Sequence, residues 1–111
     1  MFGQQVPGVA VHEVGDGAYL LDVRETDEWV AGHAPGAYHV PMMEVPSRLG
    51  EVPQEGDVVV ACRMGGRSAQ VVAYLRQHGW DNVHNLEGGM QDWAAAGREL
   101  VSDDGHPPRV V

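Results

Sequence analysis

Short apolar runs alternate with segments of helical periodicity along this chain. The short runs predict β-strands, because they have strand length and several are rich in β-branched residues. Two of them are almost continuously apolar, which is typical of strands buried on both faces of a sheet. The predicted strands are Val9–Val11, Ala18–Val23, Ala37–Val40, Asp57–Ala61 and Asn82–Glu87.

The clearest predicted helix begins at Ser68, a natural N-cap residue, and ends at Gly79. Its apolar positions recur with helical spacing and form one face, made of Val71, Val72 and Leu75. The segment MEVPSRLGEVP is predicted as a short helical or irregular connection, because Pro46 and Pro53 interrupt it.

Two further helices are predicted to be short. The first begins at Thr26 or Asp27, either of which can cap it, and ends at Gly32. The second lies within Gly88–Gly97. The side chains that we expect to face inward from these two helices are Trp29, Val30, Met90, Trp93 and Ala94.

The alternation of strands and helices predicts an α/β fold of three layers, in which helices cover both faces of a central, mostly parallel five-stranded sheet. A chain of 111 residues forms one domain of this kind. We assign the domain to residues 1–100 and expect residues 101–111, which are polar and rich in proline, to be a flexible tail. In such sheets, functional residues gather at the carboxyl ends of the strands.

Composition narrows the possible partners and location. The net charge is −9, with seven arginines and no lysine, which argues against nucleic acid as a partner. No apolar run approaches the length that spans a membrane, and the start, MFGQQVPGVAV, lacks the features of a signal peptide. We therefore expect a cytoplasmic protein that binds neither nucleic acid nor membranes. The composition says nothing about the oligomeric state.

The single cysteine, Cys62, stands at the carboxyl end of the predicted strand Asp57–Ala61. Two glycines follow it, which allow a tightly curled loop, and Arg63 and Arg67 make this loop an island of positive charge in an acidic protein. Backbone N–H groups turned toward the sulfur would form an anion-binding nest. Such surroundings lower the pKa of a thiol from about 8.5 to about 3.5–7.5.

An inert, buried core cysteine is the alternative to this interpretation, and any one of these features alone is compatible with it. Their combination in one stretch favours a reactive thiolate. This combination is a strand, then Cys-x-x-Gly-x-Arg-Ser, then a helix.

The same stretch, CRMGGRS, resembles the active loop of the rhodanese-like sulfurtransferases, which reads Cys-x-x-Gly-x-Arg-Ser. LLDVRETDEWVAGHAPGA is similar to the leading motif of that family, and NLEGGMQDWAAAG to its closing motif. The resemblance extends in order from Tyr19 to Gly97. It weakens at the ends, where the usual helix between the first two strands is reduced to HEVGDG and the tail beyond Arg98 matches nothing in the family pattern.

The resemblance implies a sulfurtransferase that carries sulfur as a persulfide on Cys62. The donor would be a small anion such as thiosulfate, and the acceptor cyanide in vitro or a thiol in cells. Because the chain has no second cysteine, the acceptor must be external. The residues expected to bind the substrate are Arg63, Met64, Gly65, Gly66, Arg67 and Ser68.

Four further residues are expected to support this loop. Asp22 and Arg24 follow a strand and so lie at the same sheet edge. Asp22 is a candidate acceptor for Ser68 or Arg67, and Arg24 for an ion pair with Glu28 four residues on. A fold-holding role is favoured for all three, and a structural hydrogen bond for His33. The histidines at positions 12, 39, 78, 84 and 106 lack paired ligand spacing, so neither a metal nor another cofactor is expected.

Three alternative functions remain open. Cysteine-dependent phosphatases and arsenate reductases use a similar cradle, but with arginine six positions after cysteine, whereas Arg67 is five positions after Cys62. A regulatory binding module is the second alternative, although such copies commonly lack the cysteine. The third is a sulfur relay that serves one protein partner.

Overall fold

The computed structural model describes residues 6–111, and its centre is a five-stranded sheet. All pairs of neighbouring strands are parallel, and the order across the sheet is β1-β5-β4-β2-β3. The predicted α/β fold is therefore confirmed. The strands are β1 (Gly8–Val9), β2 (Tyr19–Asp22), β3 (Tyr38–His39), β4 (Val58–Ala61) and β5 (Val83–Leu86).

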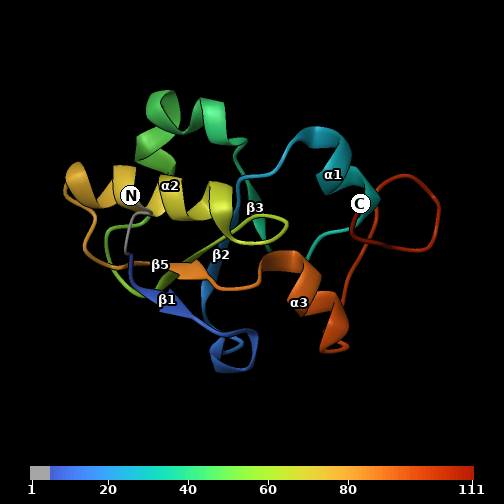
Figure 1. Cartoon of the computed structure of the whole chain (residues 1–111). Coiled ribbons are helices and arrows are strands. Elements are labelled where there is room, and N and C mark those ends of the chain that lie inside the picture. The colour runs from blue at the N-terminus through green and yellow to red at the C-terminus, as the bar shows by residue number, and fades with distance from the viewer. Residues whose placement is uncertain (1–5) are drawn as a thin grey trace.

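Helices lie on both sides of this sheet (Figure 1). The 3₁₀ segment η2 and helix α2 cover one face, while η1 and α3 lie on the other. Helix α1 stands beyond the carboxyl end of β2, at one end of the sheet. The bounds are η1 (Val11–Glu13), α1 (Thr26–Ala31), η2 (Met42–Glu51), α2 (Gly66–Gln77) and α3 (Gly89–Ala95).

The central strands contribute side chains alternately to two separate cores. In β4, Val58 and Val60 face the core under η2 and α2, whereas Val59 and Ala61 face the core under η1 and α3. This division follows from the two-residue period of a strand. It explains why β4 is apolar at every position, as the sequence analysis expected of a strand buried on both faces.

The start of α2 differs from the prediction. The helix begins at Gly66 and its N-cap is Gly65, whose φ of 112° lies in the left-handed region that glycine adopts without strain. Ser68 is therefore not the N-cap. It lies inside the first turn and is fully buried. Its hydroxyl bonds Cys62 instead of capping the helix backbone.

Three other local predictions are corrected. Ala94 is exposed, because α3 turns only Met90 and Trp93 fully into the core. The chain after β1 tightens into η1 at Val11, so the first strand is shorter than predicted. Pro46 lies inside η2, and the non-helical dihedral angles fall at Arg48 instead.

Residues 101–111 lie against α1 and the turn that follows it, where the sequence suggested a flexible tail (Figure 1). Val101 forms an antiparallel bridge with His33, with backbone hydrogen bonds of 2.9 and 2.8 Å. Further along, the Arg109 N–H donates to the Ala31 carbonyl over 3.0 Å, and Val110 packs against the core on the α3 side. These backbone bonds join the segment to α1 and the turn after it, and their partners lie too far back in the sequence for a local pattern to reveal them.

None of the helices formed by residues 6–111 has both the length and the apolarity to cross a bilayer.

Candidate active site

Cys62 stands directly after β4, where the chain curls through a tight loop into α2. Its side chain is 1% exposed, so the sulfur lies at the bottom of this loop. The Gly65 N–H donates to Cys62 Sγ over 3.0 Å, and the Ser68 hydroxyl donates over 3.2 Å. The predicted cradle of donors around the sulfur is therefore present in the geometry.

The surroundings of Cys62 act on its pKa in opposite directions. Burial raises the pKa of the thiol, because it removes water from the thiolate. Hydrogen bonds from the Ser68 hydroxyl and from the backbone N–H groups of Ser68, Gly65 and Met64 oppose this effect and outweigh it. The net result is a pKa below that of a free cysteine, which increases the thiolate fraction at neutral pH.

Ser68→Ala is expected to raise the pKa of Cys62 by about one to two pH units. The change removes a hydrogen bond to a charged group, worth about 1.5–3 kcal/mol, and one pH unit corresponds to about 1.4 kcal/mol. The midpoint of thiol alkylation against pH measures the shift. Ser47→Ala is the matched control, because the Ser47 hydroxyl bonds only a local carbonyl on the exposed side of η2. An unchanged midpoint in Ser68→Ala would contradict the role of the hydroxyl.

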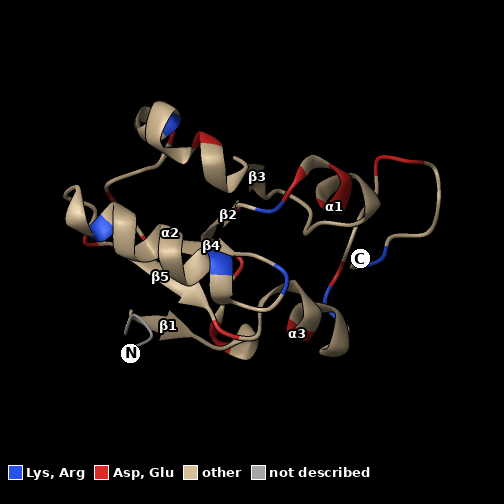
Figure 2. Cartoon of the chain, turned by 45° about the horizontal axis from the view of Figure 1, so that its top comes forward, with Lys and Arg blue, Asp and Glu red and all other residues tan. Residues whose placement is uncertain are grey.

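Arg67 and Glu28 form the ion pair nearest to the loop, with N–O distances of 2.7 and 2.9 Å. Hydrogen bonding by Glu28 raises the pKa of Arg67, and attraction to the Cys62 thiolate adds to it. The same contact lowers the pKa of Glu28. Figure 2 shows basic positions on the loop and at the start of α2, and acidic positions on α1.

The predicted partners of Asp22 and Arg24 are wrong. Arg24 bonds Asp22 instead of Glu28, with 2.7 Å between Nη2 and Oδ2, and donates also to the Gly32 carbonyl over 2.8 Å. Arg24 precedes α1, so the spacing rule for two residues on one helix does not apply to it. Both carboxylate oxygens of Asp22 accept from Arg24, while Ser68 and Arg67 have other partners: Ser68 bonds Cys62 and Asn85, and Arg67 bonds Glu28.

Of the remaining predicted residues, His33 lies against α1, and Arg63 and Met64 lie on the Cys62 loop. His33 is buried, stacks on Trp29 with 3.6 Å between the ring centroids, and bonds the Trp29 carbonyl through Nδ1. These contacts fit the structural role expected of it. Arg63 and Met64 are exposed on the loop between β4 and α2.

Two parts of this site were not predicted from the sequence. Asn85, at the end of β5, contacts the Ser68 hydroxyl through Oδ1 and donates from Nδ2 to the Gly65 carbonyl over 3.2 Å. The start of α3 holds the loop through the Met90 N–H, which donates to the Cys62 carbonyl over 2.8 Å. A polar residue among buried positions at a strand's carboxyl end was the available signal for Asn85.

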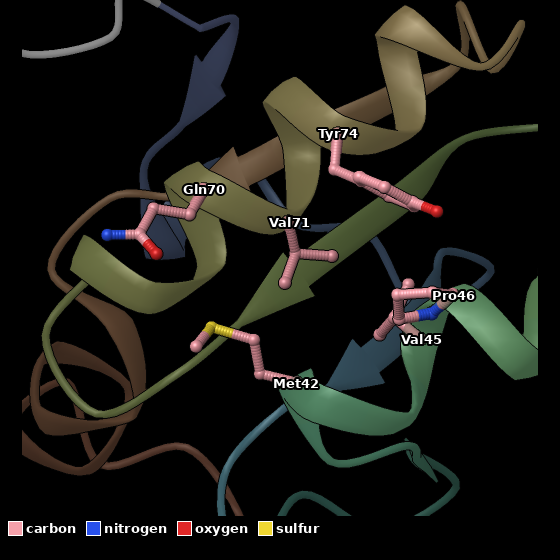
Figure 3. Close-up of a pocket in the computed structure, with 6 residues that line it drawn as sticks. All are labelled: Met42, Val45, Pro46, Gln70, Val71 and Tyr74. Atoms are coloured by element: carbon pink, nitrogen blue, oxygen red, sulfur yellow. The ribbon is translucent and has the colours of Figure 1, made fainter.

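An apolar pocket of about 170 Å³ lies between η2 and α2 (Figure 3). Cys62 does not line it, and neither do the residues of its loop. The lining side chains are Met42, Val45, Pro46, Gln70, Val71 and Tyr74. Among residues 6–111, no cluster of three potential metal ligands occurs.

Comparison with known proteins agrees with this geometry. The family model of the rhodanese-like domain matches residues 7–96. A sulfurtransferase of Allochromatium vinosum is 43% identical over 86 residues, which make up 78% of this chain and 80% of that protein. A rhodanese-related protein from Thermoplasma volcanium has a crystal structure with a TM-score of 0.80 and 28% identity, covering 86% of this chain and 97% of that one.

The structure of a thiosulfate sulfurtransferase from Pseudomonas aeruginosa is also similar, with a TM-score of 0.78 and 30% identity. The match covers 96% of this chain but only 22% of that one, so the similarity concerns one part of a longer protein. The sheet, the loop around Cys62 and the matches along most of the sequence lead to one conclusion: this chain belongs to the family of rhodanese-like domains.

Proposed function

We propose that this protein is a sulfurtransferase that takes a sulfane sulfur from a small anionic donor such as thiosulfate and carries it as a persulfide on Cys62. The observation that carries this proposal is the pair of donors, the Gly65 N–H and the Ser68 hydroxyl, directed at a buried cysteine sulfur. The similarity to a sulfurtransferase over most of both chains supports sulfur transfer as the kind of reaction.

In the first half-reaction, the Cys62 thiolate attacks the outer sulfur of thiosulfate. The S–S bond of the donor breaks, and sulfite leaves with the bonding electron pair. The enzyme then holds Cys62–S–S⁻, and the total charge is unchanged. The loop N–H groups that bond the Cys62 sulfur would also stabilise a persulfide anion formed on it.

In the second half-reaction, an external nucleophile attacks the outer sulfur of the persulfide and regenerates the Cys62 thiolate. With cyanide the product is thiocyanate. No second cysteine exists in the chain to accept the sulfur internally, so an outside thiol must take this part in a cell. The same fact is compatible with a sulfur relay to a protein partner, in which the acceptor is a protein thiol.

The loop suits a small anionic donor. Cys62 is almost completely buried, so only a sulfur that projects from a compact head can reach it. Arg63 is exposed on the loop, while Arg67 is half-buried against Glu28. We propose that both guanidinium groups attract the donor, and that Arg67 exchanges part of its contact with Glu28 for the sulfonate oxygens.

Intact-protein mass spectrometry tests the proposed function. After incubation with thiosulfate and removal of the excess, the protein is expected to gain the mass of one sulfur atom. A reducing agent should remove this mass, and cyanide should remove it with formation of one equivalent of thiocyanate. Cys62→Ser is the matched control and should never gain the mass. A serine variant that forms thiocyanate at the wild-type rate would overturn the proposed role of Cys62.

A further inference from the structure

The Ser68 hydroxyl lies between two acceptors but has only one proton. Its oxygen is within hydrogen-bond distance of both Cys62 Sγ and Asn85 Oδ1. A hydroxyl donates one hydrogen bond at a time, so the two acceptors compete for it. Ser68 is fully buried and Asn85 is 8% exposed, so water has little access to satisfy either group.

The orientation of the Asn85 amide is determined by its second contact. Its Nδ2 donates to the Gly65 carbonyl over 3.2 Å, which directs Oδ1 toward Ser68. The Gly65 carbonyl also accepts from the Ala69 N–H within α2, so it stays in place without the amide. Without Asn85 the Gly65 carbonyl therefore keeps a donor, whereas the Ser68 hydroxyl loses one of its two acceptors.

We propose that Asn85 is a positioning residue that competes with the Cys62 sulfur for the Ser68 proton and thereby sets how readily the thiolate forms. While Cys62 is a thiol, its S–H donates to the Ser68 oxygen and the Ser68 O–H donates to Asn85. When the thiol proton leaves to solvent, the Ser68 O–H rotates to the sulfur and Asn85 Oδ1 loses its donor. This proposal rests on the proposed function, because it concerns the nucleophile of that reaction.

Two substitutions at Asn85, one that removes the acceptor and one that strengthens it, should move the alkylation midpoint of Cys62 in opposite directions. A general disturbance of the loop would not produce opposite shifts. Asn85→Leu has similar size and removes the competing acceptor, so the midpoint of Cys62 alkylation should fall by about half a pH unit or more, the equivalent of one neutral hydrogen bond. Asn85→Asp provides a stronger acceptor and a negative charge, so the midpoint should rise by about one pH unit. A cooperative thermal unfolding transition serves as the control that each variant is folded.

The charged groups around Cys62 come from its loop, α2, α1, the end of β2 and α3, and these substitutions leave all of them in place. They are Arg63, Arg67, Glu28, Asp22, Arg24 and Asp92. Asn82→Asp is the matched control for charge, because Asn82 lies before β5, about 10 Å along the strand from Asn85, and its side chain donates to the Pro53 and Gly56 carbonyls, not to a residue of the Cys62 loop. Its midpoint should equal that of the wild type.

The decisive measurement repeats Asn85→Leu in the Ser68→Ala background with iodoacetamide as the probe. Without the hydroxyl there is no proton to compete for, so the substitution should then leave the alkylation midpoint unchanged. Midpoints that move in the same direction for Asn85→Leu and Asn85→Asp, or a Leu effect that persists without Ser68, would overturn the proposal. Alkylation needs no sulfur donor, so a protein that follows these predictions but never forms a persulfide would refute the proposed function alone.

Discussion

Gly89→Ala is expected to lower the free energy of unfolding by about 3 kcal/mol. Gly89 has a φ of 59°, and a Cβ atom there would lie 2.5 Å from the carbonyl oxygens of both Cys62 and Arg63. These oxygens accept backbone hydrogen bonds from Met90 and Gln91 at the start of α3. The left-handed conformation costs an alanine about 1 kcal/mol, and the loss of two such bonds adds about 1 kcal/mol each.

Gly36→Ala is the matched control for this substitution. Gly36 has a φ of 79°, but nothing lies within 4 Å of its added Cβ atom, so only the conformational cost of about 1 kcal/mol applies. Urea denaturation measures both variants. Because the clash at Gly89 moves the backbone of Cys62 itself, we also expect slower thiol alkylation in Gly89→Ala only. Equal losses of stability in the two variants would show that the contact between α3 and the loop is dispensable.

Insertion of one glycine between Gly65 and Gly66 is expected to reduce sulfur transfer about 100-fold. Gly65 would keep its place three residues after Cys62, but Ser68 would be displaced along the chain, and with it a hydroxyl and a backbone N–H that stabilise the thiolate. Loss of one donor to a reacting anion costs about 3 kcal/mol in the barrier. The rate of thiocyanate formation measures the effect.

The insertion also tests the distinction from cysteine-dependent phosphatases. It moves Arg67 to six positions after Cys62, the spacing of the phosphatase loop, so binding of phosphate or arsenate should hold steady or improve. The wild type should not hydrolyse aryl phosphates. A glycine inserted between Gly15 and Asp16 is the control, because this exposed turn precedes β2 at the opposite edge of the sheet. Unchanged sulfur transfer in the loop insertion would show that loop length does not determine the substrate.

The sequence by itself determined the architecture and the position of the cysteine in it. Apolar runs of strand length, separated by helical segments, predict a parallel sheet because each pattern reports only local geometry and burial. Cys62 at the end of the most apolar strand then falls at the sheet edge where parallel strands place functional residues. The glycines of the loop likewise indicated a curled backbone, and Gly65 has the left-handed conformation that this requires.

Only the tertiary structure decided which polar groups meet around the sulfur. Glu28 and Arg67 are 39 positions apart, and Ser68 and Asn85 are 17 apart, so no spacing rule connects them. The sequence rule for nearby charges paired Glu28 with Arg24, but Arg24 lies outside the helix and turns back to Asp22. Hydrogen bonds between side chains depend on how separate elements pack, and that packing is a property of the whole fold.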